Sequence, residues 1–210
     1  MDEVIVRRWM RASADSFSSQ RDYLTQLDAA IGDADHGLNM DRGFSAAAVD
    51  LDAIEAAAPG ALLVRVGSTL VYRVGGAAGP LFGSCFRQIG NTLGTAPTFD
   101  AEDLLKALRA GVDAIQGLGA AVEGDKTIVD AYVPALEAFE HELRAGREAE
   151  LVTRRAADAA RDGARATIPM QARKGRASYL GPRSVGHQDP GATSTALLFA
   201  ALATTVAEVP

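Results

Sequence analysis

The sequence contains one cysteine, few aromatic residues and no secretory leader pattern. Cys85 is the only cysteine among 210 residues, so it has no partner for a disulfide within the chain. Aromatic residues make up 6% of the chain, and the abundant alanines instead favour closely packed helices. The N-terminal stretch does not have the charged-then-apolar layout of a secretory signal. We therefore expect a cytoplasmic protein.

The sequence also lacks an excess of positive charge and has little β-type alternation. The formal net charge is −6, which gives no overall attraction to polyanions and argues against nucleic acid as a main partner. Apolar residues recur every three or four positions through most of the chain, as in amphipathic helices. The length suits one domain. We predict a single all-α domain over residues 1–210.

The apolar periodicity predicts nine helices, separated mostly by short breaks that contain glycine or proline. Their expected ranges are 2–18, 20–31, 38–57, 60–74, 79–93, 100–117, 126–144, 148–167 and 191–207. Short breaks make neighbouring helices antiparallel. Residues 169–190 form the exception, because they show little helical periodicity, and a loop this long inside a compact domain is usually functional.

The last helical segment needs a membrane check, because residues 190–207 carry no charge and approach the length of a membrane span. The segment includes five Ser and Thr residues and many alanines, so it is only mildly apolar. We interpret it as a buried core helix and expect no membrane partner.

Residues 27–44, LDAAIGDADHGLNMDRGF, crowd negative charge around two glycines. The four carboxylates are those of Asp28, Asp33, Asp35 and Asp41. On a continuous helix, Asp28 and Asp33 would point about 140° apart, so we predict that the glycines break the helix. In an extended loop, Asp33 and Asp35 would point to the same side. Asp28 would end a helix, where the dipole disfavours a carboxylate, so a positive group should lie nearby.

The residues allow two interpretations of these aspartates. Clustered hard oxygen ligands suit Mg²⁺ or Ca²⁺, and three carboxylates can hold two magnesium ions on a nucleotide. An EF-hand does not fit, because glycine falls at the fifth loop position and Phe44 at the twelfth. Alternatively, Asp33 or Asp35 caps the helix that starts near Leu38 and the other carboxylates are solvated. A lone histidine such as His36 is usually structural, but beside magnesium it could bind a phosphate.

Two glycine-containing turns are candidate anion sites. Residues 74–83, VGGAAGPLFG, lead into a helix and could offer backbone N–H groups, although glycines also permit close helix packing. Residues 119–127, GAAVEGDKT, resemble a P-loop, but no strand precedes them. We interpret GDKT as the start of a helix with Asp125 or Thr127 as its cap. From there, Asp125 and Lys126 could still reach a ligand.

Residues 171–187 form a basic stretch in an acidic protein. They contain no acidic residue, and their cations are Arg173, Lys174, Arg176 and Arg183. Such a surface fits phosphate or an acidic partner protein, and the alternative is a solvated loop. Pro190 and Gly191 then open the last helix, whose N-terminus could also face an anion. Together, the signals at the helix ends predict a nucleotide-phosphate site.

These motifs, in order and spread over most of the chain, resemble those of the nucleotide-binding L subunits of dihydroxyacetone kinases. The matching segments are LDAAIGDADHGLNMDRGF, VGGAAGPLFG, GDKT and MQARKGRASYLGPRSVGHQDPGATS. The resemblance implies a barrel of about eight antiparallel helices, with the nucleotide and two Mg²⁺ ions at one rim. It implies metal ligation by Asp28, Asp33 and Asp35, with Asp41 outside the ligand set. The implied nucleotide-binding residues are His36, Gly37, Leu38, Asn39, Ala77, Ala78, Gly119, Ile128, Arg176, Asp189, Pro190 and Gly191. Some relatives have serine where Ala78 stands, so only backbone contacts are expected there.

The resemblance also implies an activity, that of the ADP-binding subunit of a phosphoenolpyruvate-dependent dihydroxyacetone kinase. Tightly bound ADP would receive a phosphoryl group from a phosphotransferase-system phosphoprotein, and the resulting ATP would pass it to dihydroxyacetone on a separate K subunit. Arg176 and His36 would support the transfer, and no general base is expected on this chain. Two alternatives remain: a subunit that exchanges free ATP and serves another small ketose, and a nucleotide-state sensor that docks on a regulator.

Overall fold

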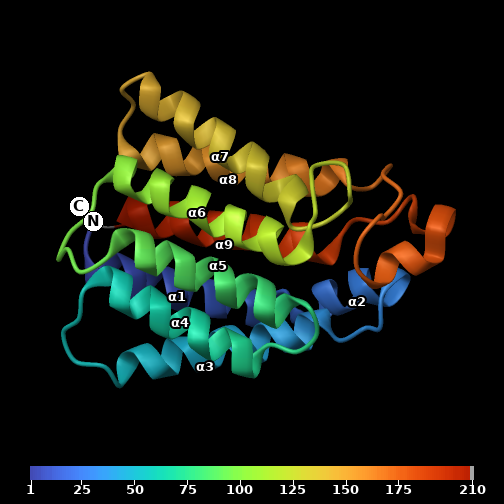
Figure 1. Ribbon diagram of the computed structural model, residues 1–210, viewed down its shortest axis with the longest axis horizontal. Coiled ribbons are helices and arrows are strands. Elements are labelled where there is room, and N and C mark those ends of the chain that lie inside the picture. Colours follow the sequence, from blue (N-terminus) through green and yellow to red (C-terminus); the bar gives the residue numbers. More distant parts are fainter. Residues whose placement is uncertain (209–210) are drawn as a thin grey trace.

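A computed structural model describes residues 1–208. Over this range the chain forms nine α-helices and one 3₁₀ helix, and no strand, which confirms the all-α prediction (Figure 1). The elements are α1 (Glu3–Ser19), α2 (Arg21–Ile31), α3 (His36–Asp52), α4 (Pro59–Arg73), α5 (Ala78–Leu93), α6 (Ala101–Gly119), α7 (Val129–Arg144), α8 (Ala149–Ala166), η1 (Arg176–Ser184) and α9 (Pro190–Glu208).

The long helices pack in an order that returns to its starting point. Helix α1 contacts α3, each helix from α3 to α8 contacts the next, and α9 contacts α1. Helix α2 and η1 contact each other at one end of the molecule, which we call the α2 end (Figure 1). The connections α2–α3, α4–α5 and α6–α7 also lie at the α2 end, and the start of α1 and the end of α9 lie at the opposite end. Segments far apart in sequence therefore gather at the α2 end.

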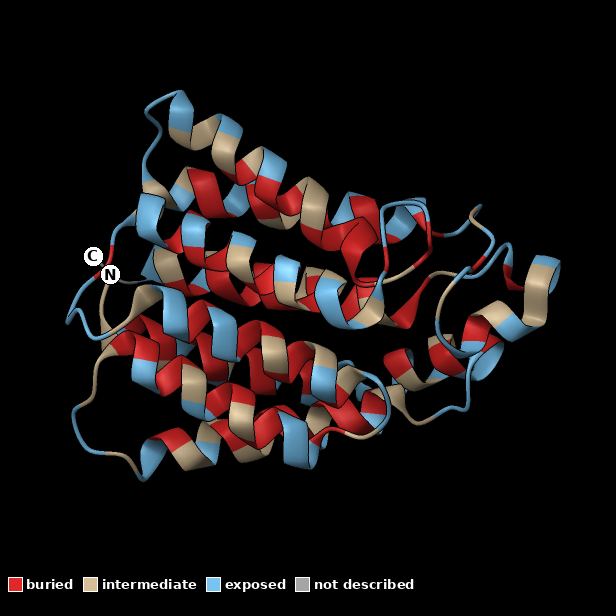
Figure 2. Ribbon diagram, in the orientation of Figure 1, coloured by how far each residue is buried: buried red, intermediate tan, exposed pale blue. Residues whose placement is uncertain are grey.

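A continuous apolar core joins these helices, and their buried faces point inward (Figure 2). Aromatic rings form its centre, with centroids 4.6 Å apart for Phe17 and Phe44 and 5.8 Å apart for Phe44 and Phe86. Cys85 lies in the same core, and burial raises the pKa of its thiol to about 12. This thiol is therefore protonated and inert in the folded protein.

Helix α9 occupies the interior, as predicted for the uncharged segment. By length and composition alone it could cross a membrane, but 61% of its most apolar stretch is buried against the other helices. Trp9 in α1 donates a hydrogen bond from Nε1 to the carbonyl of Leu198 in α9 at 2.9 Å. The prediction of a core helix is confirmed.

Three predicted boundaries need correction. The helix expected over 38–57 is α3, which ends at Asp52, because the Arg7 guanidinium binds the carbonyls of Ile54 and Glu55 and holds the chain out of the helix. The helix expected from residue 126 begins at Val129, since Lys126 has a left-handed φ of 63°. The expected loop over 169–190 contains η1.

Four glycines bring α4 and α5 into backbone contact. Gly60 and Gly67 in α4 are seven residues apart, as are Gly83 and Gly90 in α5. A Cβ at Gly67 would lie 2.4 Å from the carbonyl oxygen of Gly83, and one at Gly90 would lie 2.4 Å from that of Gly60. We call this contact the glycine seam. It holds in place the α4–α5 turn, which carries the glycine-rich motif.

We predict that Gly67→Ala lowers the free energy of unfolding by about 1–3 kcal/mol, because the new methyl group must push the two helices apart. Chemical denaturation followed by circular dichroism measures the loss. Gly117→Ala is the matched control: Gly117 is an exposed helical glycine, and among the described residues a Cβ there meets no atom within 4 Å. That control should be neutral or slightly stabilising. Equal effects of the two substitutions would contradict the seam.

Candidate functional site

A cavity of about 300 Å³ opens at the α2 end. It is lined by the α2–α3 connection, the glycine-rich turn before α5, the end of α6, the start of α7, the basic stretch and the start of α9. Of the residues predicted to bind nucleotide or metal, all except Gly37 and Leu38 line this cavity. The fold therefore brings together motifs that lie more than 150 residues apart in sequence. Binding by these residues stays a prediction.

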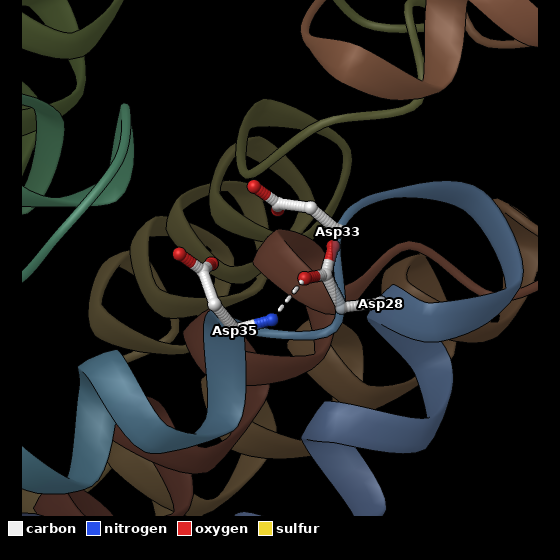
Figure 3. A group of neighbouring side chains, drawn as sticks. All are labelled: Asp28, Asp33 and Asp35. Carbon is white, nitrogen blue, oxygen red and sulfur yellow. Dashed lines mark hydrogen bonds between the residues drawn. The ribbon is translucent and has the colours of Figure 1, made fainter.

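The three predicted metal ligands converge on one point (Figure 3). One carboxylate oxygen from each of Asp28, Asp33 and Asp35 lies within 4.8 Å of the others. Asp28 is buried, whereas Asp33 and Asp35 are exposed at the cavity. Three hard oxygen donors at this separation fit the ligand chemistry of Mg²⁺, which usually keeps several waters besides a few carboxylates.

Asp28 also caps α3 from the neighbouring helix. Its Oδ2 accepts a hydrogen bond from the backbone N–H of Asp35 at 2.9 Å (Figure 3) and another from that of His36 at 3.2 Å. The positive group expected beside Asp28 is therefore the N-terminus of α3, which offsets the unfavourable end of α2. Asp35 occupies the N-cap position without a side-chain cap bond within the described chain. The alternative in which Asp33 or Asp35 caps this helix is not what the structure has.

The turn between the aspartates differs from the expected extended loop. Ala34 has a φ of 64°, so the chain makes a left-handed turn between Asp33 and Asp35. Gly32 is required for space, because a Cβ there would lie 1.9 Å from Oδ1 of Asp28. The carboxylates thus converge through a tight turn against Asp28. The prediction that an extended loop points Asp33 and Asp35 to the same side is wrong.

The basic stretch brings positive groups to the same cavity. Arg176, at the start of η1, forms an ion pair with Asp33, with 3.0 Å between Nη2 and Oδ2. Lys174 lines the same cavity two residues earlier. Because both partners of the ion pair are largely exposed, it adds little to stability. Its importance is that it sets positive charge beside the acidic cluster.

Two further helix N-termini reach the cavity, and they differ in capping. Among the described residues, no side chain caps α5, so the first N–H groups after Ala77 keep their capacity to bind an anion. At α9, by contrast, Asp189 Oδ2 accepts a hydrogen bond from the N–H of Ala192 at 2.7 Å. Burial raises the pKa of Asp189 to about 7. The start of α5 is therefore the better anion site.

His36 joins two of these helix ends. Its Nε2 lies 2.7 Å from Oγ of Ser194 in α9. Burial lowers the pKa of His36, although the carboxylates of Asp28 and Asp35 act in the opposite direction. A neutral imidazole hydrogen-bonded in this way holds α3 against α9 at the edge of the cavity.

Some predicted residues lie elsewhere, and some cavity residues were missed. Gly37 packs on α2, where a Cβ would lie 2.0 Å from the carbonyl oxygen of Arg21, and Leu38 is 53% exposed outside the cavity. The missed apolar wall includes Leu81 and Ile115. Helical spacing could have identified both, because residues three or four apart lie on the same face of a helix. Leu81 follows the predicted site residue Ala78 by three residues, and Ile115 precedes the predicted site residue Gly119 by four.

Lys126 also departs from expectation. Instead of extending to a ligand, its ammonium is buried and donates hydrogen bonds to the carbonyls of Thr167 at 2.8 Å, Met170 at 3.1 Å and His187. Asp125 is turned inward as well and accepts a hydrogen bond from the N–H of Val122 at 3.0 Å. These two residues organise the chain around the cavity.

Known proteins resemble this chain over most of its length. A family model described as the DAK2 domain matches residues 30–204. The ADP-binding subunit DhaL of the PEP-dependent dihydroxyacetone kinase of Escherichia coli (strain K12) is 44% identical over 195 residues, which cover 93% of each chain. A D-erythrulose kinase of Mycolicibacterium smegmatis is 36% identical over 195 residues, covering 92% of this chain and 34% of that protein.

A solved structure gives the same picture of the fold. The dihydroxyacetone kinase from C. freundii, in complex with AMP-PNP and Mg²⁺, matches with a TM-score of 0.74 and 26% sequence identity. The match covers 97% of this chain and 34% of that one, so this chain spans about a third of the C. freundii protein.

We predict that Asp33→Ala weakens Mn²⁺ or Mg²⁺ binding about tenfold or more, because it removes one of three converging carboxylates. Isothermal titration calorimetry measures the affinity. Asp41→Ala is the matched control, since Asp41 lies on α3 outside the cluster and bonds instead to Ser45 and Arg21. Unchanged affinity in Asp33→Ala would remove this residue from the ligand set.

We also predict a pH dependence from Asp189. Its folded pKa of about 7 exceeds the ordinary 3.8, so between these values the folded state binds more protons than the unfolded state. This residue therefore stabilises the protein at low pH, and the contribution is lost as pH rises toward and past 7. Asp189→Asn keeps a capping oxygen but removes the titrating group. Between pH 4 and 8, the unfolding free energy of the metal-free variant should therefore fall by up to a few kcal/mol less than that of the parent protein.

Denaturant titrations at several pH values measure this difference. The control is Asp162→Asn, whose side chain is 72% exposed. If Asp189→Asn kept the full pH dependence of the parent protein, the buried carboxyl would not be its source.

Proposed function

This chain belongs to the DAK2 domain family, and we propose that it is the ADP-binding subunit of a PEP-dependent dihydroxyacetone kinase. In this function, ADP held in the cavity receives a phosphoryl group from a phosphotransferase-system phosphoprotein. The group then passes to dihydroxyacetone on a separate K subunit. The E. coli relative that carries this description aligns over nearly its whole length, which supports a subunit of the same kind.

The observation that carries the proposal is the pairing of opposite charges across one cavity. Three carboxylates converge within 4.8 Å on one side, and Arg176 and Lys174 approach from the basic stretch. The uncapped start of α5 adds backbone N–H donors on a third side. A nucleoside diphosphate with magnesium presents charges of both signs. Its metal ions suit the carboxylates, and its phosphate oxygens suit the cations and the N–H donors.

The donor set fits magnesium, and Asp28, Asp33 and Asp35 would hold two Mg²⁺ ions. When bound, magnesium neutralises the negative charge of phosphate oxygens. Asp28 would serve with its remaining lone pairs, because its Oδ2 already accepts two backbone N–H groups. Capping bonds of this kind fix the direction of a ligand oxygen, as partners outside the coordination sphere generally do.

The remaining cavity residues would orient the nucleotide and exclude water. Ile115, Leu81 and Ile128 supply an apolar wall that suits an aromatic base, while the turn before α5 suits the phosphates. Arg176 would release Asp33 to magnesium and bind a phosphate oxygen, where its fixed charge stabilises the transferring group. The same family supports the finer description of the fold as a barrel of about eight antiparallel helices, and the neighbour order of the helices agrees with it.

A second candidate keeps the site but exchanges free ATP and serves another small ketose. It is favoured by the D-erythrulose kinase, of which this chain matches about a third. Mass analysis of the purified protein separates the two. Stoichiometric ADP that survives dialysis supports the bound cofactor, whereas an empty protein that turns over with added ATP supports exchange.

We predict that the chain, combined with a K subunit and the phosphodonor proteins, transfers phosphate to dihydroxyacetone and that Arg176→Ala slows this transfer about a hundredfold or more. Arg183→Ala is the matched control, because Arg183 is an exposed arginine of the same η1 segment that lies away from the cavity lining. Its rate should equal that of the parent protein.

Two results would overturn the proposal. One is the failure of the complete mixture to phosphorylate dihydroxyacetone while the same K subunit works with a known L subunit. The other is normal transfer by Arg176→Ala, which would separate the activity from this cavity.

A further inference from the structure

Lys126 is a buried cation that the proposed chemistry does not use. Its side chain is 1% exposed, and its Nζ donates to the carbonyls of Thr167, Met170 and His187. An ammonium has three protons, so all of them are committed to these backbone oxygens. Although the residue borders the cavity, it has no proton left for a phosphate.

The three carbonyls belong to the two ends of one segment, residues 167–189, which we call the basic segment. Thr167 and Met170 begin it, and His187 lies near its end. The same ends are joined by hydrogen bonds from Gly186 N–H to the carbonyl of Ile168 at 2.8 Å and from Asp189 N–H to Oγ1 of Thr167 at 2.9 Å. The ammonium thus closes the base of a loop.

The backbone around Lys126 is arranged to bring the ammonium to this point. Lys126 has a φ of 63°, a conformation that is unfavourable for a residue with a Cβ. The carboxylate of Asp130 holds the turn by accepting hydrogen bonds from the N–H groups of Gly124 at 2.5 Å and Thr127 at 2.7 Å. The carbonyl of Asp125 also accepts from Arg173 N–H at 3.0 Å, which ties the basic segment to the same turn.

The basic segment carries the cations of the site. Lys174 and Arg176 lie between the carbonyls that the ammonium binds, and Arg176 reaches Asp33. The segment has few apolar anchors of its own, since its buried apolar residues, Ala172 and Ala177, form with Ile31 and the partly buried Leu180 a small cluster separate from the main core. Its position over the carboxylates therefore depends strongly on the closure at its base.

We infer that Lys126 is a positioning residue, whose ammonium acts as an internal cation that closes the basic segment and so holds Lys174 and Arg176 over the acidic cluster. The closure is independent of the proposed function. Its effect on nucleotide binding rests on that function.

Limited trypsin digestion tests the closure directly, because the basic segment contains the cleavage points Arg173, Lys174, Arg176 and Arg183. In Lys126→Ala, cleavage within the segment should be faster by about tenfold or more, since hydrogen bonds from a charged donor are lost. Lys126→Met keeps the apolar stem and should release the segment too. Lys106→Ala removes a lysine that is 68% exposed on α6, and cleavage within the basic segment of this variant should be as slow as in the parent protein.

Chemical rescue separates positioning from a general structural role. Lys126→Ala leaves three carbonyls around an ammonium-sized space, so methylammonium should restore resistance to trypsin, whereas tetramethylammonium, which has no N–H donor, should not. The affinity for Mg²⁺-ADP should fall and recover in parallel. If Lys126→Ala does not fold alone, refolding with methylammonium should recover it, and Lys126→Met provides the digestion result.

Three results would overturn the inference. The first is a segment in Lys126→Ala and Lys126→Met that resists trypsin as well as the parent. The second is weakened nucleotide binding without faster cleavage, which would make Lys126 a direct phosphate ligand. The third is no difference between the two amines. If the parent protein binds no nucleotide, the proposed function fails, while digestion and rescue still decide the closure.

Discussion

The mutual repulsion of three carboxylates is the constraint around which the α2 end is built. Unit charges about 4 Å apart repel by roughly 1 kcal/mol in water and by several times that near a protein surface. Asp28 is offset by two N–H groups of α3, and Asp33 by the guanidinium of Arg176. The N–H groups come from the same connection as the cluster, whereas Arg176 follows it by more than 140 residues, so the compensation of Asp33 requires the folded chain. The acidic cluster thus depends both on its own tight turn and on the packing that brings Arg176 to it.

Much of the architecture follows from local patterns in the sequence. Apolar periodicity predicts the nine helices, and glycine and proline predict most of their ends, because both signals act within a few residues. The end of α3 is a failure with a clear reason: Arg7, more than forty residues away, binds the carbonyls of Ile54 and Glu55. Long-range hydrogen bonds of this kind leave no mark in the local sequence.

The site shows the same division. The aspartates, the glycine turn and the basic stretch were recognisable by residue type, and the fold gathers them around one cavity. The left-handed turn at Ala34 was not predictable, since alanine rarely adopts it and only the surrounding contacts impose it. Nor was the burial of Lys126, because its partners are backbone carbonyls, which every residue has. Composition identifies the groups that carry charge, and only the packed structure shows which of them face a ligand.

Two walls of the cavity are held in place by different kinds of contact, one by backbone packing and the other by hydrogen bonds. The turn before α5 lies beside the glycine seam, where the four glycines have no Cβ and the backbone of α4 lies directly against the backbone of α5. The basic segment is held at its base by hydrogen bonds from the Lys126 ammonium and between its own two ends, and its apolar cluster is separate from the main core. An opening of the cavity that leaves the core intact would therefore displace the basic segment before the turn at the start of α5, so the wall that suits the phosphates would keep its position while a ligand enters or leaves.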